Sequence, residues 1–112
     1  MPEAPRILTV GPTRPWHEKI REQLRTAAVE SVASGGDARR LARDWKPDIV
    51  ICEILLEDMT GLAFCRGLRE DPELRHLRVL VLSAQQSELD RWFATRFNPG
   101  LTRPRITVVR LE

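Results

Sequence analysis

The sequence contains no apolar run approaching the roughly 18 residues that a membrane-spanning helix requires. Its first residues, Met1 to Pro5, carry neither a basic nor an apolar stretch, so we expect no signal peptide. It has only two cysteines, Cys52 and Cys65, and both lie inside apolar segments. We expect them to be buried and reduced, without a redox role. These absences predict a soluble, cytoplasmic protein that does not associate with membranes.

The sequence also lacks a large excess of charge of either sign. Lysine and arginine total 18, aspartate and glutamate total 16, and the net charge is +2. Because acidic residues are interleaved with basic ones, this balance does not predict a nucleic-acid partner. A glycine-rich phosphate loop, a catalytic Ser/His/Asp set and a zinc pattern are all missing. We therefore expect no enzymatic activity, no cofactor and no metal site.

The chain has the size and composition of one globular domain. It contains 112 residues, of which 42% are hydrophobic and 30% are charged. Short apolar runs alternate with amphipathic helical patterns along it, and Thr13 and Asp37 are expected to cap the first two helices. The predicted strands are residues 7–10, 29–33, 49–52, 79–82 and 106–109. Strands separated by helical crossovers indicate an α/β fold with a doubly wound, five-stranded parallel sheet.

The third strand and the segment after it resemble the central motif of receiver domains, the input modules of bacterial response regulators. The segment Lys46 to Leu62 reads KPDIVICEILLEDMTGL. In that family "PD" introduces the third strand, a phospho-accepting aspartate ends it, and an "MxG" loop opens the third helix. Residues 66–74 and 79–84 extend the match, with Ser83 at the position of the family's switch Ser/Thr. The resemblance covers residues 6 to 97 approximately and implies a flavodoxin-like single domain over residues 1–112.

The sequence departs from the family where phosphoryl chemistry takes place. A receiver holds a divalent cation with carboxylates and transfers a phosphoryl group to its aspartate. The family's acidic pair aligns with Gly11 and Pro12, which offer no side-chain ligand, and Glu53 stands in place of the aspartate. We therefore expect a non-phosphorylated pseudo-receiver that acts as a protein-interaction module. Glu53 either mimics an activated state or is a carboxylate left after metal binding was lost.

The C-terminal part leaves two alternatives. The tripeptide Thr102-Arg103-Pro104 resembles the family's "TKP" after strand five, in which case Arg103, like Ser83, is a switch-equivalent residue and could pair with Glu53. Alternatively, the fifth strand begins after the tripeptide and the match is a coincidence. The eight residues after Pro104 are too few for the family's fifth helix. We therefore expect a fold shortened at its C-terminus, with a sheet face covered by a second copy or by a larger signalling protein.

The contact surface expected for that partner lies on the fourth helix and the last strand. Its candidate residues are Arg91, Trp92, Phe93, Arg96 and Val108. Consecutive helix positions diverge by about 100°, so Trp92 and Phe93 are not both expected in the core. Trp16 and Trp45 lie on apolar stripes and are expected to pack internally. His17 and His76 stand among charged residues without a second metal ligand, so both are expected at the surface.

Two other functions remain open from the sequence. The chain could be a phosphorylated response regulator with a rearranged acidic site, in which Glu57 or Asp58 contributes to metal binding. It could also be a small nucleic-acid-binding protein that uses the arginines of its C-terminal part. Saturable quenching of tryptophan fluorescence by Mg²⁺ would favour the first, and a steep salt dependence of DNA affinity would favour the second.

Overall fold

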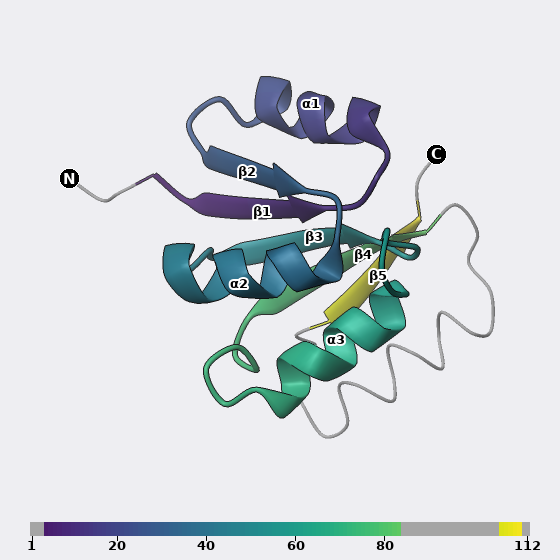
Figure 1. The fold of residues 1–112 in the computed structure, drawn as a ribbon. Helices are drawn as coiled ribbons and strands as arrows, with labels where there is room; N and C mark the ends of the chain where they lie inside the picture. The colour runs from purple at the N-terminus through teal and green to yellow at the C-terminus, as the bar shows by residue number, and fades with distance from the viewer. Residues whose placement is uncertain (1–3, 84–105, 111–112) are drawn as a thin grey trace.

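The computed structural model describes residues 4–83 and 106–110, and in these ranges strands and helices alternate. The elements are β1 (Arg6–Val10), α1 (Arg14–Gln23), β2 (Ala28–Val32), α2 (Gly35–Trp45), β3 (Ile49–Glu53), α3 (Gly61–Glu70), β4 (Arg78–Ser83) and β5 (Ile106–Arg110). All neighbouring strands are parallel, in the order β2-β1-β3-β4-β5 (Figure 1). The predicted α/β fold with a doubly wound parallel sheet is confirmed. The expected fourth helix lies outside the described residues.

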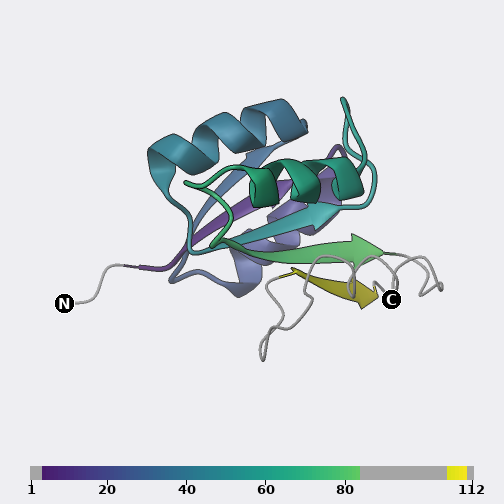
Figure 2. The same cartoon turned by 90° about the horizontal axis from the view of Figure 1, so that it is seen from below.

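The helices lie on both faces of the sheet. Figures 1 and 2 show α2 and α3 side by side on one face and α1 on the other. The main core lies between the sheet and the layer formed by α2 and α3. Alternate residues of three strands, together with residues of the two helices, form this core. Its buried members include Leu8, Val10, Val50, Cys52, Val79 and Val81 from the sheet, and Ala38, Ala42, Phe64, Cys65 and Leu68 from the helices. Within the described ranges, none of the helices has the length and apolar character needed to cross a bilayer.

The position of each strand in the sheet explains its composition. β3 lies between β1 and β4 and is a continuous apolar run, in which Val50, Ile51 and Cys52 are buried. Such runs are typical of central parallel strands covered on both faces. β2 lies at an edge and contains Glu30 and Ser31, and none of its residues is fully buried. The weak apolar pattern of β2 therefore reflects its place at the edge.

The helix starts differ from the sequence predictions. Ser34, not Asp37, is the N-cap of α2, and its hydroxyl accepts a hydrogen bond from the Asp37 N–H at 3.1 Å. Gly35 lies in the first turn of α2, and Met59 packs directly against it. A Cβ at Gly35 would lie 2.6 Å from the Met59 Sδ. Thr13 occupies the N-cap position of α1, but its side chain makes no capping hydrogen bond.

The predicted burial of the tryptophans and cysteines agrees with the structure where it is described. Trp16 and Trp45 are half-buried, and Trp45 packs against the main core. Cys52 and Cys65 are free thiols with 0% exposure. A hydrogen bond to the Cys65 thiol, together with burial, raises the pKa of Cys52 well above its ordinary value. The Cys52 thiol is therefore protonated and unreactive at neutral pH.

Among the described residues, Phe64 is the largest fully buried side chain, and sequence periodicity did not single it out. We expect Phe64→Ala to lower the free energy of unfolding by about 3–5 kcal/mol, because it removes a ring from the main core and leaves a cavity. Leu55 is 66% exposed and is the matched control. Leu55→Ala should change the free energy by less than about 0.5 kcal/mol. Denaturant unfolding of both variants measures this, and similar losses in the two would contradict the assigned core.

Candidate functional site

The carboxyl ends of β1 and β3 bring Gly11 and Glu53 together. The two strands pair in parallel, with Val10 opposite Cys52, and the next residue of each chain segment is Gly11 or Glu53. Gly11 has a φ of 148°, a conformation that L side chains rarely adopt. A Cβ at this position would lie 2.6 Å from the Glu53 Cγ and closer still to its carboxylate. The Glu53 side chain therefore occupies the space that a side chain at position 11 would need.

The Glu53 carboxylate is bound by the backbone of the β1–α1 loop. Its Oε2 accepts a hydrogen bond from the Thr13 N–H at 2.9 Å, and the side chain is only 16% exposed. A carboxylate that accepts a backbone N–H at the start of a helix is stabilised by that bond and by the helix dipole. This bond, called here the Glu53–Thr13 bond, connects the central strand to the start of α1.

His17 lies inside this site, and its predicted surface position is wrong. Its side chain is 5% exposed. Nδ1 lies 2.6 Å from the Thr9 Oγ1, Nε2 lies 3.0 Å from the Gly11 carbonyl oxygen, and Nε2 is also 3.9 Å from the Glu53 Oε2. Burial lowers the pKa of His17 below 6.5, and the Gly11 carbonyl and the Glu53 charge oppose this effect only in part. His17 is therefore neutral at pH 7.

The helical spacing of α1 contained a signal for this burial. His17 and Ile20 are three residues apart, so they share one face of a helix. Leu24 follows four residues later, but it lies just after the end of α1 and is 41% exposed. Several residues near His17 in the sequence are charged, and for that reason the sequence predicted a surface position despite this spacing. In the structure its two ring nitrogens are satisfied by Thr9 and Gly11, which makes burial of the polar ring possible.

A chain of polar side chains extends from His17 across the sheet. The Thr9 hydroxyl, on β1 and fully buried, lies 2.6 Å from the Ser31 hydroxyl on β2. The Ser31 oxygen accepts a hydrogen bond of 3.1 Å from the Arg21 guanidinium on α1. Both hydroxyls and the imidazole thus have partners within the layer between α1 and the sheet. They form a connected polar network on this face of the sheet.

Asp58 is directed toward α2 and away from Glu53. Its two carboxylate oxygens accept hydrogen bonds from the Gly35 and Gly36 N–H groups, at 2.7 and 3.0 Å. These bonds lower the pKa of Asp58. Asp58 is therefore engaged with the start of α2, and its poor placement for metal binding stays a prediction. Across residues 4–83 and 106–110, no three His, Cys, Asp or Glu side chains cluster in a way that could hold a metal ion.

The remaining predicted site residues are only partly described. Ser83 ends β4 and pairs with Arg110, and Val108 of β5 pairs with Val81, so both lie on the β4–β5 side of the sheet. β5 begins at Ile106, after the tripeptide that contains Arg103, as in the second of the two alternatives. Arg103 and the candidate interface residues Arg91, Trp92, Phe93 and Arg96 lie outside the described residues.

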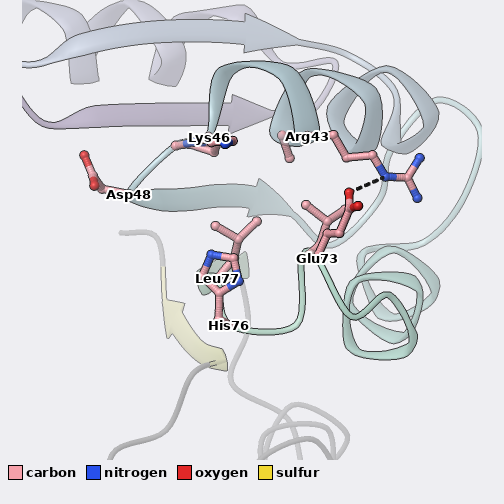
Figure 3. Close-up of a pocket in the computed structure, with 9 residues that line it drawn as sticks. Arg43, Lys46, Asp48, Glu73, His76 and Leu77 are labelled. Atoms are coloured by element: carbon pink, nitrogen blue, oxygen red, sulfur yellow. Dashed lines mark ion pairs between the residues drawn. The ribbon is translucent and has the colours of Figure 1, made fainter.

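A hollow of about 660 Å³ lies at the amino-terminal edge of the sheet, opposite the edge that carries Glu53 (Figure 3). Leu74 and Leu77 supply part of its apolar lining. Its charged lining groups include both signs, and Arg43 forms an ion pair of 4.0 Å with Glu73. The Asp48 carboxylate accepts the Arg6 N–H at 2.7 Å. Several charged groups of this lining are thus paired within the protein. The remaining groups do not point to one kind of ligand.

Comparison with known proteins places the chain in a family. The sequence matches the response regulator receiver domain over residues 14–98, which is more than half of the chain. The chain belongs to the response regulator receiver domain family. The polar-differentiation response regulator DivK of Brucella ovis is 33% identical to this receiver domain over 67 residues, which are 58% of this chain and 54% of that protein. The chain therefore spans about half the length of the curated relatives it matches.

Solved structures show the same fold as this receiver domain. The chemotaxis response regulator CheY4 of Vibrio cholerae superimposes with a TM-score of 0.75 at 20% identity, covering 84% of this chain and 80% of that one. The signal receiver domain of a histidine kinase from Syntrophus aciditrophicus gives a TM-score of 0.76 at 24% identity, with coverages of 97% and 81%. The flavodoxin-like arrangement of this receiver domain is thus shared with proteins of low sequence identity.

The close approach of Glu53 to Gly11 predicts a specific coupling between the two positions. Gly11→Ala should lower the free energy of unfolding by about 1–3 kcal/mol, because the backbone conformation is strained for alanine and its Cβ displaces Glu53. Glu53→Ala removes the obstructing side chain. The double variant should therefore lose less than the sum of the two single losses.

Denaturant unfolding of the four proteins in this cycle measures the coupling. Gly67, which lies inside α3, is the control glycine. Gly67→Ala should be neutral or stabilising by up to about 1 kcal/mol, since it replaces a helical glycine. Its Cβ would meet the flexible end of the Arg39 side chain at 3.3 Å, which can shift by a few tenths of an ångström. Strict additivity of the Gly11 and Glu53 substitutions would contradict the contact between them.

Proposed function

We propose that this receiver domain acts without phosphorylation, as a non-enzymatic protein-interaction module in bacterial signal transduction. The observation that carries the proposal is the position of the Glu53 side chain over Gly11. At the place where the family resemblance aligns its acidic pair, this chain has Gly11 and Pro12. A side chain at Gly11 would overlap Glu53. Residue 11 therefore cannot supply a carboxylate while Glu53 keeps this position.

The residues at this edge do not fit a magnesium ion. Mg²⁺ demands near-octahedral coordination and is usually held by one or two protein carboxylates together with water and phosphate oxygens. The Glu53 carboxylate lies beside Gly11 at the junction of β1 and β3, and its Oε2 is already bonded to the Thr13 N–H. Asp58 is bonded to the start of α2. A phosphoryl group at Glu53 would have no ion to neutralise its charge.

The same contact supports a single resting arrangement at neutral pH. The Glu53 side chain already connects β3 to the β1–α1 loop through the Glu53–Thr13 bond. This connection needs no transfer reaction. We propose that at neutral pH the domain presents one arrangement to its partner. This favours the hypothesis that Glu53 mimics an activated state over the hypothesis that it is a carboxylate left after metal binding was lost.

We propose that the partner is a protein, either a second copy of this chain or a larger signalling protein, in the cytoplasm. The candidate surface is the fourth helix and the terminal strand, around Arg91, Trp92, Phe93, Arg96 and Val108. The whole chain, residues 1–112, would form this one domain. The family membership and the likeness to DivK, itself named a response regulator, support a role in signalling.

Incubation with a small-molecule phosphodonor and Mg²⁺ tests the central proposal. We expect no phosphate adduct in the intact mass of the protein, because no second carboxylate shares the ion with Glu53. A receiver domain that retains the acidic pair and the aspartate is the positive control and should gain one phosphate. An acid-labile phosphate that forms on the wild-type chain and is missing from Glu53→Gln would contradict the proposal and support a phosphorylated regulator.

The solution mass tests the proposed self-association separately. Light scattering over a range of concentrations should give the mass of a dimer. Trp92→Ala should shift the equilibrium toward the monomer, and Trp45→Phe, in the described core, should leave it unchanged. A monomer at the highest concentration would contradict the homodimer and leave a larger signalling protein as the proposed partner.

A further inference from the structure

His17 joins the polar network on the α1 face to the Glu53 site. One ring nitrogen contacts Thr9 and the other contacts Gly11, and the same Nε2 lies 3.9 Å from the Glu53 Oε2. The Trp16 ring stacks on the imidazole with a centroid separation of 4.0 Å and an interplanar angle of 28°. A change of charge on His17 would therefore act at once on a hydroxyl chain, an indole and a carboxylate.

The neutral imidazole fits this environment in one tautomer. The Gly11 carbonyl can only accept, so Nε2 carries the hydrogen and Nδ1 accepts from the Thr9 hydroxyl. The Thr9 oxygen then accepts from Ser31. The Ser31 oxygen in turn accepts from Arg21, which is a donor only. Every member of the network has a partner, and the Glu53 carboxylate remains bonded to the Thr13 N–H.

Protonation reverses the hydrogen bond between Thr9 and His17. The imidazolium donates from both nitrogens, so the Thr9 oxygen must accept from Nδ1 and direct its own hydrogen elsewhere. The Glu30 carbonyl oxygen, 3.3 Å from the Thr9 Oγ1, is available for that hydrogen. The new positive charge lies beside the Glu53 carboxylate and attracts the oxygen that Thr13 holds in the neutral state.

We propose that His17 is the positioning residue of Glu53 and that its protonation is the input to this domain. The imidazolium draws the Glu53 carboxylate toward itself, weakens the Glu53–Thr13 bond and releases the β1–α1 loop at the start of α1. This inference rests on the proposed function, because it assigns to a proton the role that a phosphoryl group would have at this edge of the sheet.

The charges around His17 place its transition below neutral pH. Glu53, from β3, favours the imidazolium, whereas Arg21, from the same helix as His17, opposes it. The packed surfaces of β1 and β2 contribute the hydroxyls of Thr9 and Ser31 and no titratable side chain. An adjoining hollow of about 450 Å³ is also lined by Arg14, Glu18 and Glu57. The pKa of His17 is lower in the folded state than in the unfolded state. The contribution of neutral His17 to the free energy of unfolding is therefore complete above pH 6.5 and is lost as the pH falls through the lowered pKa.

An NMR titration of the full chain tests this proposal. We expect the His17 ring to titrate with a midpoint below 6.5, and the Thr13 amide to shift at the same midpoint as its hydrogen bond weakens. Trp16 emission should fall over the same range, since the imidazolium forms against its ring. His76 is exposed and serves as the internal reference.

Matched substitutions assign the transition. His17→Gln should abolish the Thr13 shift, and His76→Gln should preserve it. Glu53→Gln removes the attracting charge and should lower the His17 midpoint. Arg21→Met keeps His17, removes the opposing charge and should raise the midpoint. This last variant also tests the proposal if His17→Gln does not fold.

The outcomes separate this proposal from the proposed function. A Thr13 amide that stays constant through the His17 transition, or that shifts equally in His17→Gln, would overturn the proton input. The proposed function fails on a different result, a phosphate on Glu53 at neutral pH. If the Thr13 amide shift stays constant and no phosphate forms on Glu53, only the proposed role of His17 protonation is rejected, and the proposed function stands.

Discussion

The Glu53 carboxylate occupies the junction of the two central strands, and it can do so only because residue 11 has no side chain. The parallel pairing of β1 and β3 fixes the two backbones side by side. The unusual φ of Gly11 then opens a space at the end of β1 that Glu53 fills. The longer side chain of glutamate, compared with aspartate, lets the carboxylate lie over Gly11 and accept the Thr13 N–H. Restoring a carboxylate at residue 11 would therefore require Glu53 to move first.

The rest of this edge is organised by hydrogen bonds within the protein. Asp58 is bonded to the first turn of α2, where Gly35 and Gly36 allow the loop after β3 to approach closely. This bond ties the β3–α3 loop to α2 in the same way that the Glu53–Thr13 bond ties β3 to α1. Two carboxylates that lie near each other in the sequence thus hold two different helices. Neither is free to share an ion with the other.

The sequence predicted the fold well because its main signals are local. The apolar run of β3 and the turn after β1 identify a parallel sheet without any tertiary information. The family motif around Glu53 was also visible in the residues, as was the lack of a carboxylate at Gly11 and Pro12. The burial of His17 was missed because it depends on two tertiary partners, the Thr9 hydroxyl and the Gly11 carbonyl oxygen. These groups come close to the imidazole only when α1 packs on the sheet. The capping of α2 by Ser34 was missed because Asp37 is also a good N-cap residue, and the helix begins at Gly35, before Asp37.

A crystal structure determined in the presence of a high concentration of Mg²⁺ tests most directly whether Glu53 is closed to the ion. We predict that the Glu53 Oε2 remains on the Thr13 N–H above Gly11, with no ion in the site. A magnesium ion about 2.1 Å from a Glu53 oxygen, with the carboxylate turned away from Thr13, would contradict this prediction.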